Sequence, residues 1–176
     1  MKPPSFKHAA GALAVMLLIA THGALAAPAA SDVEFMNKAA EAGQMEIEAS
    51  NMAQAKAGSS AVKAFASQML QDHRAAAAEL KRVASTKGVQ LPTTPSGSDQ
   101  KTLEGLGALN GASFDKQYAN EVGVKAHTDA VALFRKASAE AKDGDIKEFA
   151  KKTLSTLEHH LELAKTMASE ISQGKS

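Results

Sequence analysis

The sequence predicts an all-α fold, namely an antiparallel four-helix bundle with a long crossover between its second and third helices. Apolar residues recur every three or four positions in four long stretches, which is the pattern of amphipathic helices. A connection of about 25 residues, rich in proline, glycine, serine and threonine, follows the second stretch and is long enough to travel the length of a bundle. We expect a short helix within it, over about residues 99–109. Alanine is abundant and only 4% of the residues are aromatic, so we expect thin, alanine-rich packing.

The N-terminus has the features of a signal peptide. A basic start is followed by an apolar run over residues 9–20, and Ala24-Leu25-Ala26 offers a small-x-small cleavage pattern. The apolar run is too short to span a bilayer as a helix. We therefore assign residues 1–26 to a signal peptide and residues 27–176 to one helical domain with no transmembrane span. The mature protein is expected to be exported, and to be periplasmic in a Gram-negative source.

Charge and cysteine content exclude several classes of function. Removing Lys2 and Lys7 lowers the 20 basic residues to 18, against 19 acidic ones, so the mature chain has a formal charge of −1. A chain of this charge does not favour nucleic acid or an anionic membrane as a partner. The absence of cysteine excludes disulfides, thiolate metal sites and cysteine nucleophiles. Protein partners are not indicated, and a monomer and a homodimer both fit.

The first helix is expected over about residues 32–56. Ser31 and Glu34 have the spacing of a capping box, in which each side chain bonds the backbone of the other residue. The apolar face of this helix is interrupted in its middle by Glu46. Gly43 lies one turn earlier and would leave space beside that carboxylate.

The second helix is expected over about residues 60–87, after a break at Gly58. Either Ser59 or Ser60 caps its N-terminus. His73 lies in the middle of its apolar face, so the ring points into the core and not at water. A titratable ring in a core needs a polar partner.

The third long helix is expected over about residues 113–142, with a break in its phase. Its second half is periodic and carries His127 on the apolar face, whereas Phe114 and Tyr118 fall nearly opposite. Either these two aromatics pack against the long connection, or a bulge near Gly123 shifts the register. We expect a local irregularity between positions 118 and 124.

The fourth helix is expected over about residues 145–173, after a tight turn at Asp143-Gly144. Asp145, with a glutamate three residues on, has the spacing of a cap. His160 lies within the apolar stripe of this helix, and its neighbour His159 points away.

Each long helix therefore places one residue of a metal-ligand type on its apolar face. In an antiparallel hairpin, residues that are equidistant from the turn lie side by side, and the residues of each hairpin meet this condition. If the connection crosses the bundle, both pairs lie near mid-height and all four side chains converge. They are Glu46, His73, His127 and His160.

Three imidazoles and a carboxylate suit a borderline divalent metal such as zinc, iron, manganese or copper. The alternative is a buried polar cluster in which Glu46 accepts hydrogen bonds from the histidines and fixes the helix register. The Glu-x-x-His pairs of a di-iron carboxylate site are absent, which argues against a ferroxidase centre. Asp72, beside His73, is expected to be solvated.

Several motifs of the chain resemble one family. The motif positions are Phe35 through Glu46, Met69-Leu70-Gln71-Asp72-His73, Phe114-Asp115 with Tyr118 and His127, and Leu154 to His160. They resemble the exported, ferritin-like bacterial family catalogued as domain of unknown function 4142, whose members often carry an outer-membrane label. The resemblance covers nearly all of the mature chain and implies a ferritin-like four-helix bundle, but no activity. The resemblance implies that five residues match motif positions of the family, namely Gly43, Glu46, His73, His127 and His160. Leu154-Ser155 stands where the family usually has a leucine-proline step, which predicts a straighter fourth helix.

Three functions from different classes follow from these observations. The first, which we favour, is an exported metal-binding bundle in envelope metal handling or stress protection, without turnover or catalytic residues. The second is a structural or interaction module of the cell envelope with a buried polar cluster. The third is a redox enzyme with a mononuclear metal, because three or four protein ligands leave an open coordination position.

Overall fold

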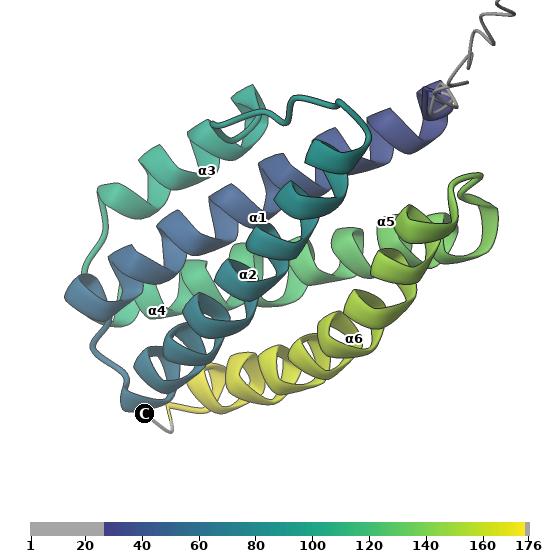
Figure 1. The fold of residues 1–176 in the computed structure, drawn as a ribbon. Helices are drawn as coiled ribbons and strands as arrows, with labels where there is room; N and C mark the ends of the chain where they lie inside the picture. The colour runs from purple at the N-terminus through teal and green to yellow at the C-terminus, as the bar shows by residue number, and fades with distance from the viewer. Residues whose placement is uncertain (1–26, 175–176) are drawn as a thin grey trace, which may run out of the picture.

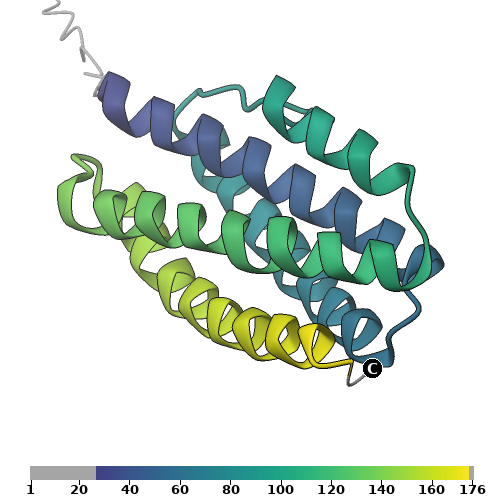
Figure 2. The ribbon, with the colours of Figure 1, turned by 180° about the vertical axis from the view of Figure 1, so that it is seen from behind.

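The computed structural model describes residues 27–174, which form helices and short connections and contain no strand. The all-α fold class is confirmed over these residues, whereas the signal peptide assigned to residues 1–26 lies outside them. Helices α1 and α2 pack side by side, as do α5 and α6, and α3 lies along the outer side of α1 (Figures 1 and 2). The elements in chain order are α1 (Ala30–Lys56), α2 (Ser60–Thr86), α3 (Gly97–Gly107), α4 (Gly111–Tyr118), the π-helical segment η1 (Ala119–Ala126), α5 (His127–Glu140) and α6 (Gly144–Ser172).

Short polar side chains begin two of the long helices. Ser59 accepts hydrogen bonds from the backbone N–H groups of Ala61 and Val62 at the start of α2. Asp143 has extended backbone and caps α6 in the same way, through two N–H groups of the first turn. The cap predicted at Asp145 is therefore wrong, because the preceding aspartate occupies the capping position and the helix already begins at Gly144.

The capping box predicted at the start of α1 is also wrong. The helix begins at Ala30, after Ala29, and no side chain caps it. Glu34 instead pairs with Lys38 at 2.6 Å, on the exposed face one turn further along. Asp32, in the first turn, has a partner outside its own helix.

Two buried aspartates join the two helical hairpins. The carboxylate of Asp32 accepts hydrogen bonds from the backbone N–H groups of Lys142 at 3.0 Å and Asp143 at 2.8 Å, in the turn between α5 and α6. The carboxylate of Asp115 accepts from Gly58 at 3.1 Å and Ser59 at 2.9 Å, in the turn between α1 and α2. Helix α1 therefore begins where α5 ends and ends where α4 begins, so it runs antiparallel to the stretch from α4 to α5.

Two lysines place the remaining helix ends. Lys87 follows α2 and pairs with Asp143 at 2.8 Å and Asp145 at 2.6 Å, so α2 ends where α6 begins. The ammonium group of Lys56, at the end of α1, donates a hydrogen bond to the carbonyl of Gly107 at 2.9 Å. Helix α3 therefore ends beside the C-terminal end of α1, as the ribbon also shows (Figure 1).

The predicted third helix, residues 113–142, is not one regular helix but the succession of α4, η1 and α5. The irregularity predicted between positions 118 and 124 is confirmed, because residues 119–126 are π-helical. A π-helical turn contains additional backbone and so rotates the residues after it relative to those before it. Phe114, Tyr118 and His127 are consequently all fully buried, although an ideal α-helix would place the first two nearly opposite the third.

A layer of polar residues divides the core into two apolar clusters. The cluster at one end includes Phe65, Tyr118 and Met167, and the cluster at the other end includes Phe35 and Phe134. On every long helical stretch the residues of one cluster precede a buried polar residue and those of the other cluster follow it, except Met45, which directly precedes Glu46 and packs with the residues that follow it. These buried polar residues are Glu46 on α1, His73 on α2, His127 at the start of α5 and His160 on α6.

Candidate metal centre

The structure brings together the four residues singled out by the sequence. Glu46 retains 2% of its exposure, His73 6% and His160 1%, and His127 is fully buried. His159, next to His160, is exposed, as its position in the sequence predicts. All four side chains of the polar layer are therefore almost completely removed from bulk water.

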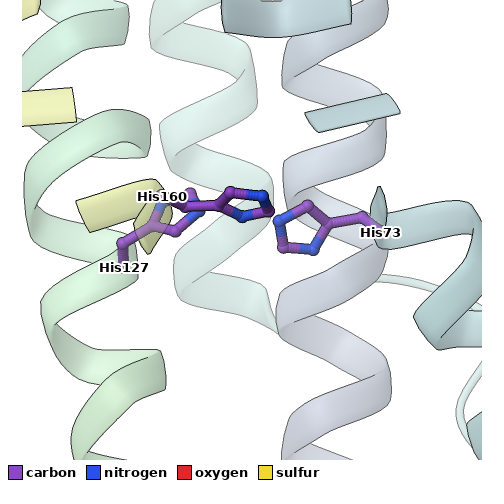
Figure 3. Close-up of side chains that lie close together, drawn as sticks. All are labelled: His73, His127 and His160. Carbon is purple, nitrogen blue, oxygen red and sulfur yellow. The ribbon is translucent and has the colours of Figure 1, made fainter. Parts of the chain in front are cut away.

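The three imidazole rings form a nearly equilateral triangle (Figure 3). The ring centres of His73 and His127 are 5.6 Å apart, those of His73 and His160 are 5.5 Å apart, and those of His127 and His160 are 5.4 Å apart. Each ring offers a nitrogen, and the three nitrogens lie within 4.8 Å of one another. The rings come from α2, α5 and α6, so the cluster joins both hairpins.

One nitrogen of each ring donates a hydrogen bond to a group behind it. His73 Nδ1 lies 2.9 Å from Glu46 Oε2. His127 Nδ1 lies 2.9 Å from the carbonyl oxygen of Val122, which is five residues earlier, the spacing of one π-helical turn. His160 Nε2 lies 2.9 Å from Asp72 Oδ2. Carbonyl and carboxylate oxygens only accept, so in each pair the ring nitrogen carries the proton.

The second nitrogen of each ring has no hydrogen-bond partner and is buried. These atoms are Nε2 of His73, Nε2 of His127 and Nδ1 of His160. Because the opposite nitrogen holds the proton, each of these atoms carries a free lone pair when the ring is neutral. A neutral imidazole with one nitrogen oriented by a hydrogen bond and the other free is the form in which histidine binds metal.

Glu46 accepts a hydrogen bond from a histidine, as in the alternative that the sequence left open. Its carboxylate lies behind the rings, bonded to His73 Nδ1 and 3.5 Å from His127 Nδ1. The group of mutually close ligand atoms consists of the three histidines without Glu46. One of its oxygens, Oε1, has no hydrogen-bond partner.

Asp72 is a site residue that sequence reasoning placed in solvent. It is partly buried and bonds His160 on the neighbouring α6, and Gln68 also donates to its carboxylate. The only sequence signal was its place directly before His73, because its partner lies 88 residues away. The carbonyl of Val122 could not be found from side-chain types at all.

The ionisable groups of the layer shift one another's pKa. Burial penalises the charge of Glu46, but the neighbouring histidines, His73 foremost, outweigh it and lower the pKa of Glu46 to about 2. For His73 burial acts against the charge, and the adjacent Glu46 carboxylate overcomes it, so the pKa is raised above its usual value. Burial lowers the pKa of His160 to about 4, and the hydrogen bond to Asp72 offsets only part of this effect.

The described residues thus define an all-helical protein with a buried histidine triad at mid-height, and none of their helices is long and apolar enough to cross a membrane. The chain belongs to the family described as Domain of unknown function (DUF4142), whose model matches residues 19–167. The family resemblance predicted from the motifs is therefore confirmed. No curated protein matches the sequence.

Two solved structures have a similar fold. A DUF305 fragment from Deinococcus radiodurans superposes with a TM-score of 0.70 and 13% identity, over 84% of this chain and 99% of that one. A DUF305 protein from Streptomyces coelicolor, described as a candidate secreted protein, superposes with a TM-score of 0.68 and 14% identity, over 81% of this chain and 94% of that one. At these identities the similarity concerns the fold alone.

Proposed function

We propose that this protein binds one divalent transition metal through His73, His127 and His160, and serves envelope metal handling or stress protection without turnover. The observation that carries the proposal is the set of three buried ring nitrogens that have no hydrogen-bond partner. Buried polar atoms in folded proteins nearly always have a partner, and an orphaned group costs about 1–3 kcal/mol. One ion would satisfy all three nitrogens at once.

The separations between the ring centres also agree with one metal ion bound by the three histidines. Zinc lies about 2.0–2.1 Å from a histidine nitrogen, so each ring centre would lie roughly 3.2 Å from the metal. Three ligands at tetrahedral to trigonal angles would then place their ring centres roughly 5.2–5.5 Å apart. The observed separations of 5.4, 5.5 and 5.6 Å lie at the upper end of this range or just above it.

The three groups that accept hydrogen bonds from the rings are suited to orient the histidines toward a metal. Glu46, the Val122 carbonyl and Asp72 each fix one ring in the tautomer that turns its lone pair inward. Carboxylates and carbonyls in this position orient histidine ligands and make them more basic. We therefore assign Glu46 a positioning role, in place of the direct ligation that the sequence predicted, which leaves a fourth coordination position open. Imidazole donors suit zinc, copper and iron, and manganese is the fourth metal to test.

We also propose that the fold is a ferritin-like four-helix bundle in which the connection after α2 crosses from one end to the other. The proposal is supported by the helix ends that Asp32, Asp115 and Lys56 fix, since they place the start of α4 opposite the end of α2. Export to the periplasm is proposed from residues 1–26 of the sequence. The related fold of a candidate secreted protein agrees with it.

The second candidate is a structural module of the envelope in which the same residues lock the helix register. It is favoured by the short contact of 2.9 Å between Glu46 and His73, which is an ion pair when the histidine is protonated. A register lock without metal, however, leaves the three inward nitrogens without a partner among the described residues. For this reason we favour the metal site.

Metal content and metal-dependent stability test the proposal. The mature protein, purified without a histidine tag, is expected to contain about one zinc, iron, manganese or copper ion per chain, and His73→Ala and His127→Ala are expected to lose it. His159→Ala, at the exposed neighbour of the site, is the matched control and should keep the metal. A protein that contains no metal and shows no change in melting temperature with any of the four metals would overturn the proposal.

A second arm uses Glu46→Gln, which keeps the shape of the side chain and removes its charge. Metal that binds only the folded state adds about 2.7 kcal/mol to stability at a hundredfold excess over Kd. At pH 7.5, zinc should raise the melting temperature of the wild type and raise that of Glu46→Gln much less. The rise should shrink near pH 5.5, because protons then compete with the metal for the histidines. An equal rise in both proteins would contradict the role assigned to Glu46.

A further inference from the structure

A cavity of about 710 Å³ opens beside the polar layer, between α1, α2 and residues 88–93 of the connection, and residues of α5 and α6 also line it. Glu46 and His73 line it, whereas His127 and His160 do not. The walls are mainly apolar and consist largely of alanine. The apolar lining includes Ala39, Ala42, Ala76, Leu80, Leu91 and Phe134.

We propose that this cavity binds a small, mainly apolar molecule whose head group donates a hydrogen bond, as a primary amine or an alcohol does. The site adjoins the proposed metal ligand His73, but Glu46 and not a free ring nitrogen receives the head group. The proposal therefore stands whether or not a metal is bound.

The volume and the lining of the cavity agree with such a ligand. Small-molecule sites in proteins are clefts of about 300–1,000 Å³ with mostly apolar walls and a few polar groups. Alanine is frequent among the residues that line this cavity, and Gly43 leaves the space beside Glu46 unfilled, since a Cβ added there would meet no atom within 4 Å. Removing the apolar body of a ligand from water would then supply the affinity.

Glu46 specifies the head group. Its side chain is 2% exposed and lines the cavity, and its Oε1 atom has no hydrogen-bond partner among the described residues, although His127 Nδ1 lies 3.5 Å from it. A carboxylate only accepts hydrogen bonds, so a donor from the ligand would satisfy this atom. A carboxylate head would instead face a like charge in a site with little water to screen it. The cavity should therefore discriminate amines and alcohols from acids with the same chain.

Binding to the metal-free protein tests the proposal. The mature protein, treated with EDTA, is titrated with 1-aminoanthracene, a fluorescent molecule with an apolar body and one amine. Binding should saturate at one molecule per chain, and decylamine and decanol should displace the probe at concentrations at least about tenfold lower than decanoate does. The absence of saturable binding, or equal displacement by the three competitors, would overturn the proposal.

Filling the cavity provides the matched variants. Gly43→Leu and, from the opposite wall, Ala76→Leu should weaken binding of the probe at least about tenfold. Gly105→Leu is the control, because Gly105 is also helical and also has no atom within 4 Å of an added Cβ, but lies on α3 outside the cavity. Circular dichroism shows which variants are folded. Unchanged binding in a folded Gly43→Leu or Ala76→Leu would place the probe elsewhere and refute the site.

Glu46→Gln tests the head group separately. It should still bind the probe but lose the preference for decylamine over decanoate, because the charge that repels the acid is gone. A preference that persists would show that Glu46 does not receive the head group. If the metal proposal fails while these expectations hold, the cavity is a binding site in its own right.

Discussion

At the scale of single residues, each imidazole has two differently used nitrogens. One donates to Glu46, to the Val122 carbonyl or to Asp72, and the other faces the centre without a partner. The choice of tautomer differs between the rings, since His160 uses Nε2 where the other two use Nδ1. The three rings therefore share no sequence motif. They share a nitrogen lone pair that faces the centre of the cluster, and in each ring a different hydrogen-bond acceptor on the other nitrogen fixes this orientation.

The pKa of His160 predicts how the metal-free protein responds to acid. The unfolded chain protonates this histidine near its ordinary value of 6.5, whereas the folded protein does so only near pH 4. Between these values the unfolded state binds more protons, so the stability contributed by the neutral ring is lost as the pH falls. Glu46 adds a second loss between its ordinary value of 4.5 and about 2. Unfolding free energies from urea titrations should therefore fall from pH 6.5 to 4, and fall further below.

The control for this prediction is a pair of neighbouring histidines. His160→Gln should flatten the decline between pH 6.5 and 4, whereas His159→Gln, at an exposed position, should leave it unchanged. His73 has the opposite sign: its raised pKa adds stability that is complete below pH 6.5 and is lost as the pH rises further. An equal effect of the two glutamine variants would contradict the assignment of the loss to His160.

At the scale of elements, the π-helical segment η1 determines what the third long stretch can bury. It allows Phe114 and Tyr118 to pack in one apolar cluster while His127 enters the polar layer. It also places the Val122 carbonyl where it receives the proton of His127 Nδ1. The irregular turn therefore serves both the core and the candidate metal centre.

Gly123→Ala tests this role of η1. An added Cβ would lie 3.2 Å from Ala164 Cβ and 3.3 Å from Met167 Cε, so η1 and α6 must separate by a few tenths of an ångström. We expect this overpacking to lower the unfolding free energy by about 1–3 kcal/mol. It should also reduce the zinc-induced rise in melting temperature, because η1 carries the Val122 carbonyl that orients His127, and α6 carries His160.

Gly105→Ala is the matched control for Gly123→Ala. It replaces another helical glycine, on α3, where an added Cβ meets nothing within 4 Å. The better helix propensity of alanine should stabilise this variant by up to about 1 kcal/mol, with the zinc response unchanged. If Gly123→Ala were stabilising to the same degree, the close contact with α6 would not constrain η1.

The same elements explain what could be predicted from the sequence. The helical class and the irregular third stretch follow from periodicity, and Glu46, His73, His127 and His160 are recognisable because each interrupts an apolar face. Local capping signals failed where the helix begins earlier than predicted: α1 begins at Ala30, before Ser31, and Asp143 instead of Asp145 caps α6. Asp72 was missed because its partner belongs to another helix, and the Val122 carbonyl because backbone groups leave no trace in side-chain patterns.

At the scale of the whole molecule, the two hairpins hold each other by a reciprocal arrangement. A carboxylate from the first hairpin receives the backbone of the second turn, and a carboxylate from the second hairpin receives the backbone of the first turn. Both carboxylates are buried, at opposite ends of the molecule. Between them, the histidine triad takes its rings from both hairpins. Association of the hairpins is thus held at both ends and at the centre.

Asp32→Asn and Asp115→Asn test this arrangement. Each amide keeps the side-chain shape but loses the charge and presents an N–H₂ group to backbone donors, so each variant should lose about 1–3 kcal/mol of unfolding free energy. Because the two contacts lie at opposite ends, the losses should add in the double variant to within about 0.5 kcal/mol. Asp129→Asn is the control: its only partner is the exposed Lys125, and its effect should stay below about 1 kcal/mol. Chemical denaturation at pH 7 measures all four. If the double variant lost no more unfolding free energy than either single variant, the two ends would not hold the hairpins independently. A second unfolding transition in either single variant would mean that the hairpins separate before they unfold.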